Sequence, residues 1–480
     1  MNAAVGQGLL EQALARRQCH ARAAKLDVIA GARTGGYDHH IATLVPLLQE
    51  VILVNFLSRF VCVCALMAAA VPAMVKAQGY STCETWDELV KGESFRYLPL
   101  TRVSDPGAPD ERRYTGFWFY DELQFDEIDR YALAMTVRFQ GRDVTSADRG
   151  EIGYFDLANG FKWTKIGETT AWNWQQGCRL QWRPQSSEIL WNDRAEDGKH
   201  FVCRAYDFAS GKVRTLPRPI YDVSPDGRFA LTHEFARMAH GGTAYVGIPD
   251  PYADQRTPPA GVDKMDMDTG DVTPLITIER IARIAYPNGY KNDSNLYFFR
   301  EGWNPSGTRF IVFLKTSAQP VQTTGWSISA DGQDVRFSYN RPSHHAWMND
   351  TTILEGDGFN LYNDDGTGKL AARLAEVKAN TDPTFVPGTN QEWILGDTYP
   401  LEGYQHLFLY HRPSMRFVPL ARLRNTAPAG IHRIDLHART SRSGRLVCID
   451  ASHEGLGRQM YVMNIGLILD NPPTSRSSGG

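Results

Sequence analysis

The chain has 480 residues and a formal net charge of −3, and 42% of its residues are hydrophobic and 11% aromatic. This is the composition of a globular protein with enough apolar material for a large core. The near-neutral charge excludes a strong electrostatic attraction to nucleic acid or to an anionic membrane surface, so we expect no nucleic-acid partner and no membrane contact beyond export.

The first 77 residues predict targeting sequence rather than fold. Residues 1–53 are rich in Ala, Arg and His and have no hydrophobic pattern that continues, so we expect a mis-annotated leader. Residues 54–77 resemble a signal peptide, because Arg59 precedes an apolar run from 60 to 71 and a small-residue exit ends at Ala77. A membrane anchor is the alternative, but the apolar run is short for a span. We therefore expect a periplasmic or secreted protein.

Four cysteines follow residue 77, namely Cys83, Cys178, Cys203 and Cys448. An even number in an exported chain permits disulfides, and Cys178 and Cys203 fall in one predicted repeat where they can pair. Buried free thiols are the alternative. No CxxC or Cys/His spacing typical of a zinc site is present.

Two short patterns recur along the rest of the chain. The first is a tight turn followed by an apolar strand, as in Ser224–Leu231 and Asn304–Ile311, where Pro and Gly occupy turn positions. The second is a strand that ends in a polar hairpin turn, as in Tyr206–Val213 and Met267–Val272. One copy of each pattern in about 40 to 60 residues describes a four-stranded propeller blade.

The fold class predicted from these repeats is all-β, a seven-bladed β-propeller of the WD40/TolB-like type, forming a single domain over 78–470 before a disordered tail at 471–480. A β-sandwich is the alternative. The seventh blade supplies three clear strands, so we expect 95–100 to add the fourth and close the ring. Residues 277–284 are the best helix candidate. The blades are expected near 120–168, 175–218, 219–278, 300–338, 344–376, 381–424 and 435–466.

Several local motifs carry a family resemblance over about 120–466. They are Trp174–Cys178, Trp191–Arg194, Gly247–Asp254, Trp303–Phe310, Ser343–Trp347, Gly396–Pro400, Arg433–Arg439, His453–Gly455 and Arg458–Tyr461. At these residues the chain resembles TolB-type β-propellers of the oligogalacturonate lyase-like group. The resemblance implies a carbohydrate-active protein whose partner is an acidic oligosaccharide or polysaccharide.

The resemblance also implies a set of axial residues. Members of the group present histidines to the central axis, and true oligogalacturonate lyases hold a divalent metal there. His344 and His437 match such positions, whereas Arg300 and Asp382 stand where relatives carry histidine. Asp382 can join His344 and His437 in a site for Mn or Ca, but Arg300 cannot ligate a metal. The alternative is that Arg300 pairs directly with a uronate carboxylate.

β-Elimination of a uronate polymer needs a cation or metal for the carboxylate, a base for the adjacent proton and an acid for the leaving oxygen. The candidate catalytic residues are His344, His437, Arg300 and Arg237. The candidate substrate-binding residues are Arg433, Gln175, Gln176, Asn192, Arg194 and His233. Each has a structural alternative, such as a buried His437–Asp435 pair or packing between blades.

The sequence thus predicts a polysaccharide lyase acting on uronate-containing oligosaccharides. Two alternatives stay open. A glycoside hydrolase would use two axial carboxylates, for which Asp382 and Asp435 are available. A non-catalytic propeller would only bind a glycan or a protein.

Overall fold

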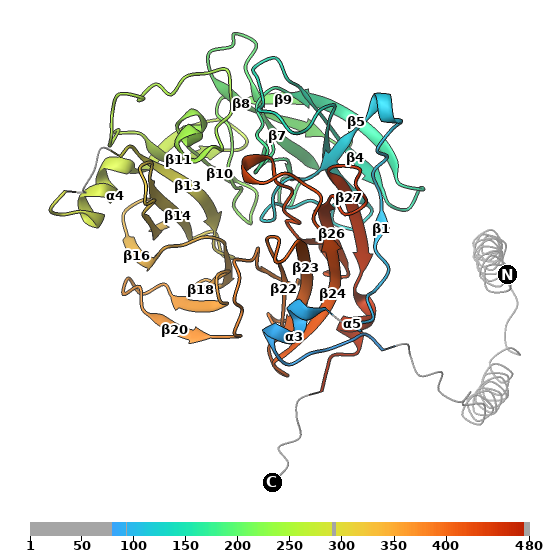
Figure 1. The fold of residues 1–480 in the computed structure, drawn as a ribbon. Helices are drawn as coiled ribbons and strands as arrows, with labels where there is room; N and C mark the ends of the chain where they lie inside the picture. Colours follow the sequence, from blue (N-terminus) through green and yellow to red (C-terminus); the bar gives the residue numbers. More distant parts are fainter. Residues whose placement is uncertain (1–78, 93, 290–293, 475–480) are drawn as a thin grey trace, which may run out of the picture. The chain divides into compact units, whose positions relative to one another are not determined.

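The computed structural model describes residues 79–92, 94–289 and 294–474. In this part of the chain seven β-sheets are arranged radially around a central axis (Figure 1). The prediction of a seven-bladed β-propeller is therefore confirmed. The leader and signal peptide predicted over 1–77 lie outside the described residues, as does most of the predicted tail.

The first three blades have their innermost strand near the axis and their outermost strand at the rim. Blade 1 is β2 (Tyr114–Gly116), β3 (Tyr131–Val137), β4 (Gly150–Asp156) and β5 (Lys162–Thr169). Blade 2 is β6 (Gln181–Trp182), β7 (Glu188–Arg194), β8 (Phe201–Asp207) and β9 (Val213–Leu216). Blade 3 is a three-stranded sheet of β10 (Phe229–Thr232), β11 (Gly261–Asp266) and β12 (Val272–Thr277).

The next three blades each have four antiparallel strands. Blade 4 is β13 (Leu296–Trp303), β14 (Arg309–Thr316), β15 (Thr323–Ser329) and β16 (Val335–Asn340). Blade 5 is β17 (His345–Asn349), β18 (Thr352–Glu355), β19 (Asn360–Asn363) and β20 (Leu370–Arg373). Blade 6 is β21 (Thr384–Phe385), β22 (Trp393–Asp397), β23 (Tyr404–His411) and β24 (Arg416–Arg424).

Blade 7 joins the two ends of the propeller. Its strands β25 (Arg439–Thr440), β26 (Leu446–Ala451) and β27 (Gln459–Asn464) come from the end of the domain, and β1 (Thr101–Arg102) pairs with β27 at the rim. The closing strand thus comes from the N-terminal side as expected, but it begins at Thr101, just after the predicted segment 95–100. The boundaries of the blades that the turn patterns predicted otherwise differ from the observed ones by at most ten residues, the largest difference being at the start of blade 3.

Short helices lie between or beside the blades. The helix expected at 277–284 is α4 (Ile278–Ala285), which begins after Thr277 because the Thr277 side chain accepts a hydrogen bond from the Arg280 amide. The others are α3 (Trp86–Lys91), α5 (Gly466–Asp470), η1 (Pro109–Glu111), η2 (Phe235–Gly241) and η3 (Gly430–His432). No helix in the described part of the chain is long and apolar enough to cross a bilayer.

All four cysteines in the described residues are buried free thiols. The pairing considered for Cys178 and Cys203 is therefore wrong. Cys178 packs in the core shared by blades 1 and 2, and Cys203 packs in the core shared by blades 2 and 3.

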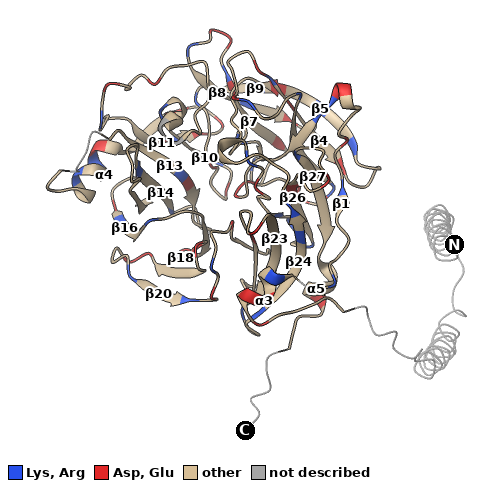
Figure 2. Ribbon diagram, in the orientation of Figure 1, with Lys and Arg blue, Asp and Glu red and all other residues tan. Residues whose placement is uncertain are grey.

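Acidic and basic residues are interspersed over the blades (Figure 2).

Blade 1 has an irregular innermost segment that reaches into the channel. After β2 ends at Gly116, residues 117–122, here called the axial loop, interrupt the strand before it resumes beside β3. The Tyr120 hydroxyl reaches blade 5, where it donates to the His345 carbonyl and accepts from the His345 amide, both at 3.0 Å. The axial loop therefore crosses from one side of the channel to the other.

A buried carboxylate on blade 7 holds the start of this loop. Asp450 accepts hydrogen bonds from the amides of Phe117 and Trp118 at 3.0–3.1 Å. The same carboxylate pairs with Arg439 at 2.9 Å and with Arg458 at 2.8 Å, and all three side chains are at most 1% exposed. Because each of these buried charges is paired, the network fixes where the axial loop enters the channel.

Candidate active site

Four predicted residues from four blades lie together at one end of the channel. Arg300 comes from β13, His344 and Asp382 precede β17 and β21, and His437 precedes β25. His344 Nε2 lies 2.6 Å from Arg300 Nη2 and 3.0 Å from Asp382 Oδ1. His437 Nε2 lies 3.8 Å from Asp382 Oδ2. We call Arg300, His344, Asp382 and His437 the axial cluster.

The backbone is strained at two of these positions. Arg300 has φ 57° and His437 has φ 44°, values in the left-handed region that non-glycine residues rarely adopt. Arg300 sits in a β-bulge, where the register between β13 and β14 shifts between Phe299 and Glu301. Bulges re-aim side chains, and strain of roughly 1–3 kcal/mol per residue is typical of functional sites. The fold thus bends two inner strands to place these side chains in the cluster.

Arg300 is a buried cation whose charge is not paired. It is 8% exposed, and in the described part of the chain no carboxylate lies within 4 Å of its guanidinium. One of its nitrogens, Nη1, is buried without a hydrogen-bond partner. Its face packs on Phe119 of the axial loop, with the guanidinium carbon 4.8 Å from the ring centre. A buried, unpaired guanidinium is a site that favours an anion.

The contacts of His344 fix its tautomer. Because an arginine can only donate, Nε2 of His344 accepts from Arg300 and the ring proton is on Nδ1. Nδ1 then donates to Asn380 Oδ1 at 2.7 Å. Burial, and next the charge of Arg300, holds the pKa of His344 well below its usual value. His344 is therefore neutral at neutral pH and aims a lone pair at the cluster.

Asp382 is a buried acid among other acids. It is 2% exposed, its amide donates to Asp397 Oδ1 at 3.1 Å, and Asp435 also faces the cluster. Burial raises the pKa of Asp382 well above its ordinary value, and the charge of Asp397 raises it further. Asp382 is therefore more inclined than an ordinary aspartic acid to hold a proton and to donate it.

His437 is the less constrained of the two histidines. It is 3% exposed, its Nδ1 has no hydrogen-bond partner among the described residues, and its Nε2 is 3.8 Å from both Asp382 and Asp435. Burial, followed by the charge of Arg458, holds its pKa well below the usual value. A neutral imidazole with no strong partner can accept a proton from a bound molecule.

Arg433 and Tyr399 form the partly exposed side of the cluster. Arg433 donates from Nε to Asp435 at 2.8 Å, and its side chain is 33% exposed. Its guanidinium carbon is 5.0 Å from the centre of the Tyr399 ring, which lies 6.1 Å from the His344 ring. A ligand that approaches from solvent on this side meets Arg433 before it reaches Arg300.

Two predicted residues belong to other parts of the molecule. Arg237 is 2% exposed and donates to Asp250 and to the Leu296, Tyr252 and Gln255 carbonyls at 2.7–2.9 Å, so it anchors the 250–256 loop instead of joining the cluster. His233 pairs with Glu301 at 2.5 Å and stacks on Phe235 at 4.4 Å between ring centres. Sequence reasoning placed both near the substrate because it did not foresee these long-range partners.

The other predicted substrate contacts are also engaged by the protein. Gln175 donates to the Ile431 carbonyl at 2.7 Å, and Gln176 donates to the Tyr221 hydroxyl at 2.7 Å. Asn192 is fully buried and exchanges hydrogen bonds with the backbone of Ile220, both at 2.7 Å, so it joins blade 2 to blade 3. Arg194 donates to the Ser146 carbonyl. These residues hold the blades together.

Sequence reasoning missed several residues that surround the cluster. Phe119 packs on His437 with ring centres 5.4 Å apart, and Tyr120 packs on His344 at 5.6 Å. Lys315 lies on the Phe299 ring, and burial followed by the charge of Arg300 lowers its pKa to about 8. Lys315 lies on strand β14 opposite Tyr297 of β13, so no local signal in the sequence indicated that its side chain approaches the Arg300 charge.

The cluster as it stands does not fit the metal site that the resemblance implied. Arg300 Nη2 donates a hydrogen bond at 2.6 Å to Nε2 of His344, and the lone pair of this Nε2 is the one that a metal would need. No group of three or more His, Cys, Asp or Glu side chains within 79–92, 94–289 and 294–474 is arranged to hold a metal ion. His344, Asp382 and His437 supply donors of the right type, but the guanidinium stands among them.

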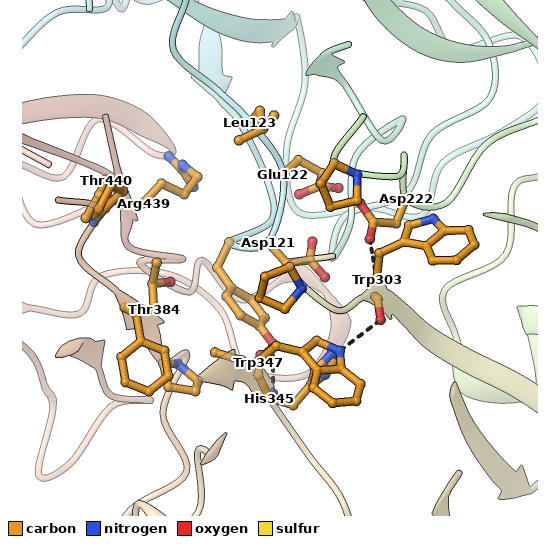
Figure 3. Close-up of a pocket in the computed structure, with 18 of the residues that line it drawn as sticks. Asp121, Glu122, Leu123, Asp222, Trp303, His345, Trp347, Thr384, Arg439 and Thr440 are labelled. Carbon is orange, nitrogen blue, oxygen red and sulfur yellow. Dashed lines mark hydrogen bonds between the residues drawn. The ribbon is translucent and has the colours of Figure 1, made fainter. Parts of the chain in front are cut away.

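A separate pocket of about 470 Å³ lies beyond the axial loop. Its lining includes Pro305 and Pro387, which lie in the turns that follow the inner strands β13 and β21, whereas the cluster residues His344, Asp382 and His437 stand just before inner strands. Figure 3 shows Asp121, Glu122 and Asp222 together on one side of this pocket, with Trp303, Trp347 and His345 nearby. The inner strands thus present two different sites along one channel.

Comparisons with known proteins give the fold. No family model matches the chain, and no curated protein matches it. An oligogalacturonate lyase solved in complex with manganese is similar, with 12% identity, a TM-score of 0.54, and coverage of 80% of this chain and 96% of that one.

The crystal structure of an oligogalacturonate lyase from Vibrio parahaemolyticus is also similar, with 10% identity, a TM-score of 0.52, and coverage of 81% of this chain and 97% of that one. At these identities the likeness shows a shared propeller fold, which agrees with the resemblance drawn from the sequence.

Proposed function

We propose that the protein is a polysaccharide lyase that cleaves uronate-containing oligosaccharides by β-elimination, acting after export to the periplasm or the outside of the cell. The observation that carries the proposal is Arg300, a buried guanidinium with no carboxylate of the described residues within 4 Å and a free nitrogen at Nη1. A uronate carboxylate supplies the missing anion in the planar, bidentate geometry that arginine favours.

The other residues of the axial cluster supply the base and the acid that the β-elimination needs in addition to the pair between Arg300 and the substrate carboxylate. Arg300, with Arg433 at the entrance, neutralises the carboxylate and stabilises the charge that develops when the neighbouring C–H bond breaks. His437, neutral and without a strong partner, takes that proton. The electrons of the C–H bond form the new C=C double bond, and the bond to the glycosidic oxygen breaks. Asp382, whose pKa is raised by burial, gives its proton to the departing oxygen.

The remaining contacts have positioning roles in this scheme. Asn380 holds His344 in the tautomer that accepts from Arg300, so His344 orients the guanidinium. Asp435 holds Arg433 through its Nε at 2.8 Å. A bound divalent ion would supply charge neutralisation of the same carboxylate, but Arg300 fills that place in the residue set described above, and no step of this scheme depends on a metal.

A glycoside hydrolase is the second candidate. Asp382 and Asp435 both approach His437 Nε2 to 3.8 Å, so two carboxyl groups flank one point of the cluster as such a reaction requires. The lyase is favoured because a hydrolase has no use for an unpaired guanidinium between its acids.

The test is a screen of the purified protein on uronic-acid polysaccharides and oligosaccharides. A lyase produces an unsaturated sugar that absorbs ultraviolet light, together with new reducing ends. New reducing ends without absorbance would replace the proposal with the hydrolase. Binding of the substrate with neither product would make the protein a glycan-binding propeller.

A further inference from the structure

The pocket beyond the axial loop has an excess of acidic groups. Four carboxyl side chains line it, namely Asp121, Glu122, Asp222 and Glu301. Arg179 pairs with Asp121 at 3.1 Å and with Glu122 at 2.7 Å, and His233 pairs with Glu301. Asp222 has no cation within 4 Å among the described residues, and it accepts only from the amides of Trp303 and Val223.

The two arginines that line this pocket do not offset these acids. Arg439 pairs with Asp450 at 2.9 Å, and its Nε donates to Gln124. Arg442 donates to the Phe125 carbonyl and approaches Glu127 at 3.5 Å. Both guanidinium groups are thus committed to other partners, and the carboxylate excess inside the pocket is not compensated by them.

Buried polar atoms on the pocket wall point to a bound partner independently of the charge count. Four such atoms have neither a hydrogen bond nor an ion pair in the described part of the chain. They are Oε2 of Glu122, Oε2 of Glu301, Nδ1 of His345 and Nε1 of Trp303. Glu122, Glu301 and His345 are 7%, 0% and 5% exposed. A buried polar group without a partner costs about 1–3 kcal/mol, so a wall with several favours a ligand that satisfies them.

The rest of the wall determines which cation fits. Trp303, Trp347, Phe385 and Tyr120 give the pocket aromatic faces, and prolines of three turns frame it. Aromatic faces combined with carboxylates bind ammonium and guanidinium groups on carbon chains. Within the described residues no group of three or more His, Cys, Asp or Glu side chains is arranged to hold a metal ion, so the four carboxyl groups of this pocket do not converge on one point as the ligands of a hard divalent ion do. A cavity of about 470 Å³ is large enough for a small organic molecule.

We propose that this pocket is a binding site for an organic cation, an alkyl ammonium or guanidinium group that pairs with Asp222 against the faces of Trp303 and Trp347. The site is distinct from the axial cluster, because Tyr120 and Asp121 of the axial loop lie between the two. The ligand proposed for this pocket is a cation, whereas the ligand proposed for the axial cluster is an anion.

The test is to titrate the whole protein with n-butylammonium and with n-butylguanidinium. Binding is measured by calorimetry and by tryptophan fluorescence. 1-Butanol serves as the neutral control ligand of similar shape. The cations are expected to bind and to change the fluorescence, and 1-butanol is expected to bind at least about tenfold more weakly. Equal binding of alcohol and cation, or no saturable binding of either cation, would overturn the proposal.

Variants locate the site. Asp222→Asn keeps the shape and is expected to weaken n-butylammonium binding about tenfold or more, while Asp254→Asn, which changes an exposed carboxylate, leaves it unchanged. Equal weakening by both variants would contradict the location. If Asp222→Asn does not fold, Asp121→Asn replaces it, and the comparison of cation with alcohol on the unmodified protein stands alone. Putrescine and N-acetyl-lysine amide then distinguish a free polyamine from a peptide side chain as the source of the cation.

Because no uronate enters this experiment, its failure leaves the proposed lyase untouched, and the absence of lyase activity does not affect its outcome.

Discussion

The two sites along the channel differ in which charge they leave unpaired. In the axial cluster the group without an ion-pair partner is the Arg300 guanidinium, whereas in the pocket beyond the axial loop it is the Asp222 carboxyl group, whose pKa burial raises to about 7 and which is fully ionised only above that pH. Neighbouring residues supply both, since Arg300 and His344 belong to the cluster while Glu301 and His345 line the pocket. Two pairs of neighbouring residues thus contribute to different sites, so one channel has two sites of opposite charge preference, a difference that the net charge of −3 does not reveal.

The axial loop keeps these two sites apart. Two of its aromatic side chains, Phe119 and Tyr120, pack on His437 and His344, and its acidic side chains, Asp121 and Glu122, line the pocket.

The largest effect is expected from the acid of the cluster. Asp382→Asn removes the proton donor to the leaving oxygen while keeping the shape, so kcat should fall by about 10²–10⁴-fold with little change in KM. Asp435→Asn is the comparison, because Asp435 only holds Arg433 in the lyase scheme and its loss should cost about tenfold or less. Steady-state kinetics on an oligouronate measure both, and equal losses of kcat would favour the hydrolase.

The separation of the two sites depends on Asp450. Asp450→Asn leaves Arg439 and Arg458 as buried cations without a charged partner and weakens the hold on the Phe117 and Trp118 amides. The free energy of unfolding should fall by about 3–5 kcal/mol. Urea denaturation measures it, and the exposed Asp254→Asn variant should stay within about 0.5 kcal/mol of the unmodified protein. A loss for Asp450→Asn as small as that of Asp254→Asn would contradict the role of this network.

A smaller effect is expected from the pH dependence of stability through Asp222. Burial raises the pKa of Asp222 to about 7, so the folded protein holds a proton that the unfolded chain releases near pH 4. The stability from this group is complete below about pH 4 and is lost as the pH rises to about 7, at no more than about 1.4 kcal/mol per pH unit. Asp222→Asn should flatten that decline. An unchanged slope in urea denaturation between pH 4 and pH 7 would show that Asp222 does not carry the proton.

Local chemistry explains why the fold was predictable. Turns such as Ser224–Gly227, with Pro225 at the turn and Gly227 at φ 74°, fix where one strand ends and the next begins. Recurring signals of this kind predict the blades, and equivalent positions on successive blades bring Arg300, His344, Asp382 and His437 to one end of the axis. The closing strand begins at Thr101 and not within the predicted segment 95–100. Its start was harder to predict because this strand pairs at a sheet edge and no hairpin turn joins it to its partner β27.

The unpredicted parts depend on contacts between distant residues. The axial loop has the aromatic composition of an ordinary strand, and only Asp450 of the last blade shows that it leaves the sheet. Arg237 and Asn192 carry the side chains of a sugar-binding site, yet their hydrogen bonds go to the backbones of Leu296 and Ile220. A sequence pattern shows the type of a polar side chain but not which buried group it will satisfy.

The most direct test of the lyase is the ultraviolet absorbance of the product formed by the unmodified protein and by Arg300→Lys, each with and without a chelator. If Arg300 neutralises the substrate carboxylate, the chelator should change the rate little, and Arg300→Lys should lower kcat/KM about 10²-fold because lysine keeps the charge but loses the bidentate pair. Loss of activity on chelation that Mn²⁺ restores, together with full activity of Arg300→Lys, would contradict the account.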